Sequence, residues 1–351
     1  MQVATPANRW LANATVSNLA SLGVSLIATM LVVGLLAETV GRGGFEVLGA
    51  MISGAFGSWP AIVETIREAT PIALCGLAFL IPFQAGFFNI GAQGQLQVGA
   101  LVAVFITTTI TLPAVLMIPI AMILAAVAGS LLMAPALVLK THRGANEVTT
   151  TVMLNFVALE FVLMMVTGPM KEPGSFIAES VLIPEAYRLP GTDLHLGVFM
   201  TVVIALALAW ILKRTVFGFR LAAVGGNRSA ADALGIRSNM TLAKAVLGAG
   251  AIAGLAGGIQ ALGVVFQVAE LWAKPWGFIG ILAALMGRTP VGVLFAALFL
   301  AGLEIGGRNM QAMTGVPAAL VYMMQALPVI FYLAIRSTHL YRTLIGRGER
   351  Q

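Results

Sequence analysis

The segment GFFNIGAQGQ at residues 86–95 decides how the chain folds, because it interrupts a membrane-like pattern. It follows the apolar run IALCGLAFLIPF and precedes LQVGALVAVFITTTI, so glycines and uncharged amides separate two stretches with the composition of membrane helices. Non-helical backbone at membrane depth persists only where protein or a water-filled cavity satisfies its polar groups. The segment therefore predicts an interrupted membrane helix.

The composition of the whole chain is that of a membrane protein. Of 351 residues, 59% are hydrophobic and 10% are charged, whereas soluble domains carry about 25% charged residues. Because each crossing of the hydrocarbon needs roughly 20 apolar residues, the long apolar runs leave little room for a soluble domain. We expect an all-α polytopic membrane protein, with residues 1–351 forming a single transmembrane domain.

The apolar runs predict about ten transmembrane helices. Their expected positions are 18–37, 61–83, 88–111, 113–139, 146–168, 195–212, 241–267, 276–288, 290–307 and 316–335.

The charges predict the orientation of these spans. If the N-terminus is cytoplasmic, fourteen of the twenty basic residues lie on the cytoplasmic side, and the acidic connection 169–195 lies on the opposite side. Loops rich in Lys and Arg face the cytoplasm, so we expect an even number of spans with both termini in the cytoplasm.

The sequence offers no residues for catalysis. It contains no GxxxxGK[ST] phosphate-binding loop, so it cannot hydrolyse ATP in the P-loop manner, and it has no HExxH metal motif. The single cysteine, Cys75, excludes an intrachain disulfide and a cysteine metal cluster. We expect a chain that is not an enzyme and that binds no metal or cofactor itself.

Glu160, in LNFVALEFVLMM, is the clearest ionisable group within an expected span. A carboxyl group at that depth costs several kcal/mol unless it is paired or protonated, and such groups often mark a functional site. A position near a helix end or beside a polar neighbour is the alternative.

A second interrupted segment, WAKPWGFIGILAALMGRTPVGVLFAALF, occupies residues 272–299. The span count gives it the opposite orientation to 86–95. Gly- and Pro-interrupted segments at corresponding positions of two inverted halves indicate a substrate pathway near the middle of the membrane. A tight helix–helix turn or a glycine packing site is the alternative for these interrupted segments. Separately, the small-residue run 248–263 predicts close packing of helices.

The cytoplasmic connection 213–240 contains NRSAADALG, which predicts a short helix with Asn227 as its N-cap and Gly235 as its left-handed stop. Such a helix needs a surface to pack against. It lies either on the membrane surface or in a groove of a soluble partner.

Four motifs together resemble the permease subunit of a bacterial ABC importer. They are GFFNIGAQGQLQVGA at 86–100, NEVTTTVMLNFVA at 146–158, TVFGFRLAAVGGNRSAADALGI at 215–236 and GFIGILAALMGRTPVGVLFAAL at 277–298. They are similar to the simple-sugar and nucleoside branch of the branched-chain amino acid/ribose permease family.

The resemblance implies a complex in the bacterial cytoplasmic membrane. Two permease subunits, identical or homologous, would form the pathway, and a periplasmic or lipid-anchored protein would deliver the substrate to the side of the periplasmic loop 169–195. Partner ATPase subunits would bind ATP and Mg²⁺ and would dock on a coupling helix within 213–240. The residues implied for this coupling are Arg220, Asn227, Ala230, Ala231, Gly235 and Ile236.

The resemblance and the residue types together suggest the pathway. Its candidate residues are Phe88, Asn89, Gln93, Gln95, Glu147, Asn155, Trp276 and Phe278. Amides exchange hydrogen bonds with a neutral solute without burying a charge, and aromatic rings stack on a base, so a nucleoside or nucleobase is the expected solute. A ribose-like monosaccharide is the alternative within this class. An ion-coupled secondary transporter or channel that uses Glu160 is the alternative from another class.

Overall fold

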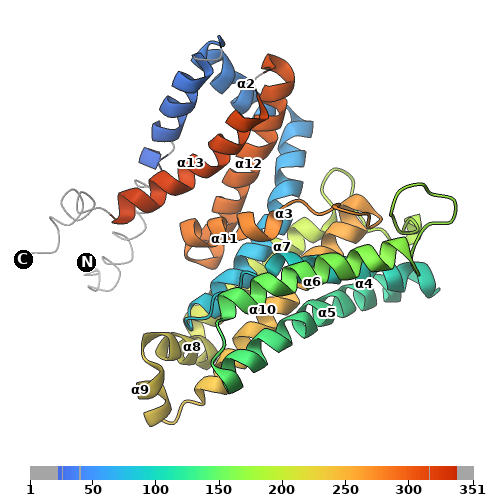
Figure 1. The fold of residues 1–351 in the computed structure, drawn as a ribbon, viewed down its shortest axis with the longest axis vertical. Coiled ribbons are helices and arrows are strands. Elements are labelled where there is room, and N and C mark those ends of the chain that lie inside the picture. Colours follow the sequence, from blue (N-terminus) through green and yellow to red (C-terminus); the bar gives the residue numbers. More distant parts are fainter. Residues whose placement is uncertain (1–22, 26, 39–40, 316, 338–351) are drawn as a thin grey trace, which may run out of the picture. The chain divides into compact units, whose positions relative to one another are not determined.

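The computed structural model describes residues 23–25, 27–38, 41–315 and 317–337, and Figure 1 shows them as a set of helices joined by loops. They contain no named β-strand. The chain divides into two compact units, Met1–Thr65 with Gly302–Gln351, and Ile66–Ala301. The expected all-α fold is confirmed, whereas a single domain over 1–351 stays a prediction.

The larger unit holds most of the helices. In chain order they are the greater part of α3 (Trp59–Phe83), α4 (Ala92–Thr109), α5 (Ala114–Arg143), α6 (Glu147–Thr167), the 3₁₀ turn η1 (Glu185–Tyr187), α7 (Leu196–Arg214), α8 (Val216–Gly226), α9 (Arg228–Ala233), α10 (Ser238–Gln260), the π-helical turn η2 (Ala261–Val265), α11 (Trp276–Gly287) and the first part of α12 (Pro290–Thr314).

The smaller unit contains the helical residues of Gly23–Glu38, α2 (Gly44–Phe56), the end of α12 and α13 (Ala318–Ser337). Helix α2 starts at a close approach, because a Cβ on Gly44 would lie 2.8 Å from the carbonyl oxygen of Gly34. With 13 residues, α2 is too short to cross a bilayer. For that reason the hydropathy pattern did not reveal it.

Six described helices are long and apolar enough to cross a membrane: α3, α5, α6, α7, α10 with η2, and α12. The positions of the expected spans agree with these helices to within a few residues, except that α12 continues to Thr314, beyond the expected end at residue 307. The count of ten stays a prediction. The span expected from residue 88 begins at Ala92 instead, because residues 84–91 form a non-helical loop. Residues 18–22 and 26 of the first expected span, and residue 316 of the last, lie outside the described residues.

The core of the larger unit is the packing of α10 against α4 and α5. Glycines make this approach possible, since a Cβ on Gly254 would overlap the carbonyl oxygen of Ala125, and one on Gly257 would overlap that of Leu96. The prediction that small residues in 248–263 mediate close helix packing is confirmed.

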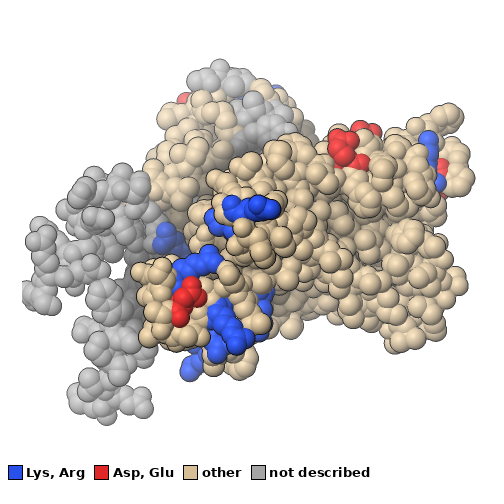
Figure 2. Space-filling view, turned by 60° about the horizontal axis from the view of Figure 1, so that its bottom comes forward, with Lys and Arg blue, Asp and Glu red and all other residues tan. Residues whose placement is uncertain are grey.

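The two ends of the larger unit differ. At one end, which we call the loop end, segment 168–195 covers the turn after α10, with Ser180 N donating to Val268 O at 2.8 Å and Ile183 N to Phe266 O at 2.8 Å. The opposite end carries α8 and α9. We call it the basic end because exposed Lys and Arg side chains gather there, as Figure 2 shows with this end turned forward.

Candidate functional site

The backbone of the loop 84–91 is held by polar side chains of α6. Ile90 N donates to Thr151 Oγ1 at 3.3 Å, and Ile90 O accepts from Asn155 Nδ2 at 2.9 Å. Asn155 Oδ1 also accepts from Gly94 N, at 2.8 Å, in the first turn of α4. Thr151 and Asn155 are four residues apart and lie on one face of α6. Protein groups thus satisfy this interruption, as membrane depth requires.

Two amides inside the loop bond to each other. Asn89 Nδ2 donates to Gln95 Oε1 at 3.2 Å, and Gln95 Nε2 donates to Asn89 Oδ1 at 3.1 Å. Asn89 Oδ1 also accepts a hydrogen bond from Gly91 N. Asn89 Nδ2 donates its second hydrogen to Ala78 O. Both side chains are buried. These amides shape the loop, because their hydrogen bonds are made within the protein. Their contact with a solute stays a prediction.

Gln93 joins the two interrupted segments. Its Oε1 accepts from Gly277 N at 2.7 Å, at the start of α11, and its Nε2 donates to Lys274 O at 2.9 Å. Backbone N–H groups at the start of a helix have no partner inside the helix. The side-chain oxygen of Gln93 is the hydrogen-bond acceptor for one such group, that of Gly277. The sequence placed both interruptions correctly, and the structure shows that their helix starts are in direct contact.

Glu68 of α3 holds the same junction from the other side. Its Oε2 lies 2.7 Å from Lys274 Nζ, and its Oε1 accepts from Trp276 Nε1 at 2.6 Å. Trp276 is buried, and its indole nitrogen is bonded to Glu68, while its stacking on a solute stays a prediction. Sequence reasoning missed Glu68, although an acidic residue within the expected span 61–83 was a usable signal.

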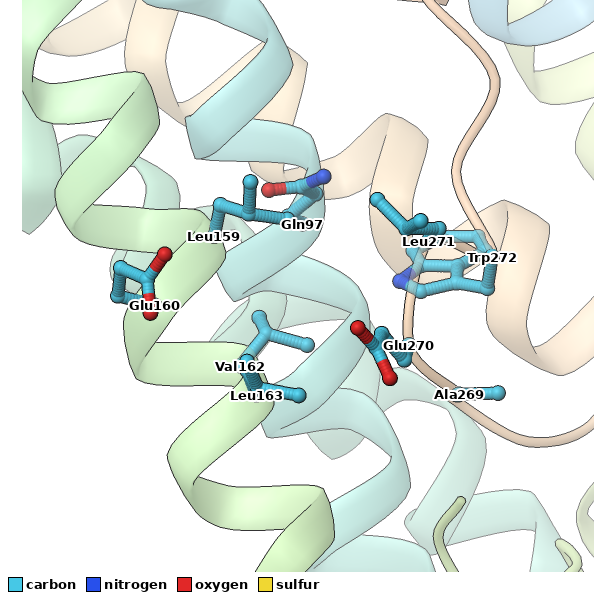
Figure 3. A pocket seen from close by; sticks show the side chains of 9 residues that line it. All are labelled: Gln97, Leu159, Glu160, Val162, Leu163, Ala269, Glu270, Leu271 and Trp272. Atoms are coloured by element: carbon cyan, nitrogen blue, oxygen red, sulfur yellow. The ribbon is translucent and has the colours of Figure 1, made fainter. Parts of the chain in front are cut away.

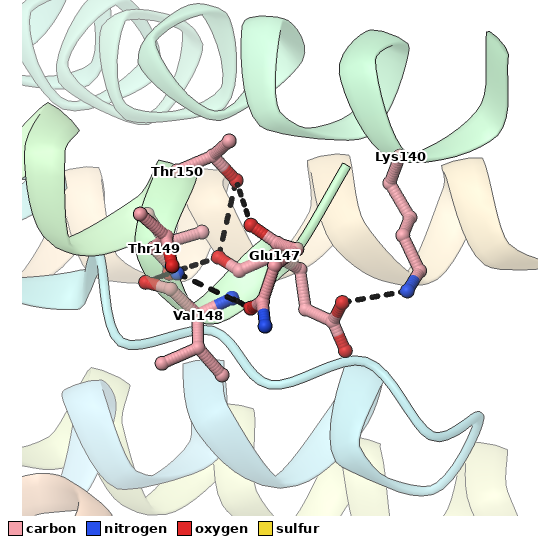
Figure 4. A network of polar contacts seen from close by, with 7 residues as sticks. Lys140, Glu147, Val148, Thr149 and Thr150 are labelled. Atoms are coloured by element: carbon pink, nitrogen blue, oxygen red, sulfur yellow. Dashed lines mark hydrogen bonds and ion pairs between the residues drawn. The ribbon is translucent and has the colours of Figure 1, made fainter. Parts of the chain in front are cut away.

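Glu147 and Lys140 form an ion pair at the basic end, with Glu147 Oε2 2.7 Å from Lys140 Nζ (Figure 4). The pair ties the end of α5 to the start of α6. Asn146 caps α6 by accepting from the N–H groups of Val148 and Thr149. The carboxylate of Glu147 therefore has a cationic partner within the chain, and its role in the pathway stays a prediction.

Two of the expected pathway residues present open aromatic rings. Phe88 and Phe278 are both more than one third exposed. The ring of Phe88 makes edge-on contacts with Phe79 and Phe83, at centroid distances of 6.3 and 5.2 Å. These two rings remain candidates for contact with a solute.

Glu160 is exposed on α6 and belongs to the lining of a cavity of about 100 Å³. The cavity lies between α4, α6 and segment 269–272. Figure 3 shows Glu160 on the side of the α6 ribbon away from Glu270, and Gln97 between α6 and the segment that carries Trp272. Among the described residues, no group of three or more His, Cys, Asp or Glu side chains is placed to hold a metal ion.

The short helix α9 confirms the prediction made from NRSAADALG. Asn227 caps it, with Oδ1 accepting from Ala230 N at 3.0 Å, and Gly235 follows it with a φ of +80°. Ala231 is buried, and its role in coupling stays a prediction. Of the other expected coupling residues, Ile236 is half-buried and the rest are exposed: Arg220, Asn227, Ala230 and Gly235.

Helix α8 connects α9 to the loop 84–91. Leu221 is fully buried in a cluster with Ile81 of α3 and Ala245 of α10. A Cβ on Gly225 would overlap the carbonyl oxygen of Gln84, so the backbone of α8 touches the first residue of the loop. The backbones of α8 and of the loop 84–91 are therefore in direct contact.

Most of the chain matches one family of transport proteins. Residues 61–333 match the family described as the permease component of the branched-chain amino acid transport system. The chain belongs to this family. As a permease subunit of an ABC transporter it is a transport component, and membership favours this class over an ion-coupled secondary transporter or channel.

Curated relatives agree with this class over most of their length. The chain is 35% identical over 310 residues to the guanosine ABC transporter permease protein NupP of Bacillus subtilis, covering 86% of this chain and 88% of the relative. It is 32% identical over 342 residues to the glucose ABC transporter permease protein TsgB13 of Haloferax volcanii, covering 93% and 90%.

A third relative also carries a nucleoside name. The chain is 30% identical over 297 residues to the nucleoside ABC transporter permease protein NupB of Lactococcus lactis, covering 80% and 81%. No solved structure matches the chain.

Proposed function

We propose that this permease carries a nucleoside across the bacterial cytoplasmic membrane, powered by ATP hydrolysis on separate ATPase subunits. The observation that carries the proposal is the similarity to permeases named for guanosine and for nucleosides, which extends over four fifths or more of the chain. The junction of the interrupted segments also fits a neutral solute, because its charged groups, Glu68 and Lys274, are paired with each other.

ATP and Mg²⁺ bind to the ATPase partners in this proposal, and this chain holds no cofactor. The docking element is α9 at the basic end, where Leu234 presents an apolar side chain that is 80% exposed. Arg228 and Arg237 flank it. An exposed apolar group bordered by cations matches a groove on a soluble partner, and α8 passes the movement of that partner to the loop 84–91.

The remaining partners follow from the proposed orientation. Both termini and the basic end face the cytoplasm, in agreement with the positive-inside rule. The loop end faces the periplasm and receives a substrate-binding protein. A second permease subunit, homologous or identical, packs against this chain, and the pathway lies between the two subunits.

Docking is tested with two matched substitutions in the complete transporter. We expect Leu234→Asp to reduce co-purification of the ATPase subunits and to abolish uptake of radiolabelled nucleoside. Leu182→Asp, on an exposed residue of the loop end, serves as the control for the added charge and should leave co-purification intact. Equal co-purification with both variants would rule out docking at α9.

Glucose is the second candidate substrate, because TsgB13 is similar over 93% of this chain. Competition separates the two candidates. In cells that lack other nucleoside transporters, excess unlabelled nucleoside should block uptake of labelled guanosine, and glucose should not. Uptake of labelled glucose with no uptake of guanosine would reject the nucleoside proposal.

A further inference from the structure

The cavity between α4, α6 and segment 269–272 contains two buried polar atoms that have no hydrogen-bond partner. One is Oε1 of Gln97, a side chain only 6% exposed, and the other is Nε1 of Trp272. Leaving such an atom unpaired costs about 1–3 kcal/mol. An unpaired acceptor and an unpaired donor on the lining of one cavity indicate a ligand that completes them.

Apolar side chains form one wall of the cavity. Figure 3 shows Val162 and Leu163 of α6 facing the segment that carries Trp272, with Gln97 reaching in from α4. Leu159 belongs to the same wall. Apolar side chains next to the Gln97 acceptor and the Trp272 donor suit the hydrogen-bonding edge of a heterocyclic ring. The lining also carries the carboxylates of Glu160 and Glu270.

The size of the cavity sets how much of a ligand it takes. Its volume is about 100 Å³, well below the roughly 300–1,000 Å³ of pockets for drug-sized ligands. It therefore admits one ring system and leaves an attached sugar outside. Glu270, exposed at the lining, carries a carboxylate that accepts hydrogen bonds from hydroxyl groups.

The cavity adjoins the junction of the interrupted segments. Gln97 lies four residues after Gln93, on the same face of α4, and Gln93 caps α11. Trp272 makes an edge-on contact with Trp276, with ring centroids 6.0 Å apart. A ring bound against Trp272 thus lies against a neighbour of Trp276, the first residue of α11.

The backbone beside the cavity is strained. Leu271, which is 74% exposed, has a φ of +55°, a conformation that costs a residue with a side chain about 1–3 kcal/mol. Such outliers gather at ligand clamps and switch regions. Here the strained residue lies between the exposed carboxylate of Glu270 and the indole of Trp272.

We propose that this cavity binds the base of the nucleoside during transport, with Gln97 Oε1 accepting from an N–H group of the base and Trp272 Nε1 donating to a ring nitrogen or carbonyl oxygen. This site rests on the proposed nucleoside transport. It gives the permease its own selectivity for the base, and it couples occupancy to α11 through Trp276.

The test uses the complete transporter in cells that lack other nucleoside uptake. We expect Gln97→Leu and Trp272→Phe each to lower kcat/KM for guanosine uptake about tenfold, the loss of one hydrogen bond in a buried site. Gln260→Leu is the matched control, because Gln260 Oε1 is also buried without a partner but does not line the cavity. Membrane levels of the transporter are measured for every variant.

Nucleoside analogues with one ring nitrogen replaced by CH separate binding from a structural effect. The wild-type transporter should discriminate against the analogue that lacks the acceptor for Trp272, and Trp272→Phe should lose that discrimination. Two outcomes would overturn this site while leaving the proposed function intact. One is an equal loss of uptake for all analogues. The other is that Gln97→Leu and Trp272→Phe take up guanosine as Gln260→Leu does, as expected of a cavity that holds only water. Absence of nucleoside uptake by the wild type would overturn the proposed function itself.

Discussion

Gln93 and Gly277 connect two helix starts that are far apart in the sequence: the side-chain oxygen of Gln93 accepts from the backbone N–H of Gly277 at 2.7 Å. The same amide donates to Lys274 O. One side chain thereby fixes how α4 and α11 meet, and the junction can open only if both hydrogen bonds break.

Gly277→Ala should loosen this junction. A Cβ at this position would overlap the backbone nitrogen of Gln93 and lie 2.6 Å from its Cα, and backbone cannot rotate away as a side chain can. Overpacking of this kind costs about 1–3 kcal/mol, so we expect a lower thermal unfolding midpoint in detergent and reduced uptake. Gly248→Ala, with nothing within 4 Å, is the control; the same shift in both would contradict the prediction.

Asn155→Leu should destabilise the loop 84–91. The change leaves Gly94 N and Ile90 O without their side-chain partners, at about 1–3 kcal/mol for each buried group. Limited proteolysis and the unfolding midpoint measure the effect. Thr149→Val, at an exposed position on the same helix, should behave as wild type, and an equally stable Asn155→Leu would show that α6 does not hold the loop.

Gly254→Val should disrupt the packing of α10 on α5. A Cβ there would overlap the carbonyl oxygen of Ala125 and lie 2.9 Å from the Cα of Gly129, so the two helix backbones would have to separate. We expect loss of folded protein by size-exclusion chromatography. Gly248→Val, six residues earlier on an open side of α10, provides the comparison and should yield normal amounts.

Gly225→Ala should separate ATPase binding from transport. Its Cβ would overlap the carbonyl oxygen of Gln84 and displace α8 from the loop, while α9 remains available for docking. We expect the ATPase subunits to co-purify normally and nucleoside uptake to fall. Gly226→Ala, with nothing within 4 Å, should transport normally; full uptake by Gly225→Ala would exclude α8 as the route of coupling.

His195 should make the stability of the protein depend on pH. Burial and then the nearby charge of Arg67 lower its pKa from 6.5 to about 4, so the unfolded chain takes up a proton at a higher pH than the folded one. Stability is therefore fully present above pH 6.5 and is lost as the pH falls from 6.5 towards 4. His195→Gln should flatten the unfolding midpoint across this range, and an unchanged pH dependence would assign it to other groups.

Sequence patterns anticipated features that depend on neighbouring residues. The cap of α9 by Asn227 and its stop at Gly235 were predicted because both interactions span a few residues. The long apolar runs placed six spanning helices for the same reason. The roles of Asn89 and Gln95 were not predictable, since an amide that faces a solute and an amide bonded within a loop have the same sequence signature.

The sequence by itself determined that this is a helical membrane protein of a permease family, because apolar runs and short motifs depend only on residues that are close together in the chain. The tertiary structure alone decided which polar groups have hydrogen-bond partners within the protein and which do not. Glu68 meets Lys274 and Trp276 across about 200 residues of chain, and Gln97 shares a cavity with Trp272. Those pairings arise only when distant helices pack, since burial and hydrogen-bond partners are properties of the folded whole.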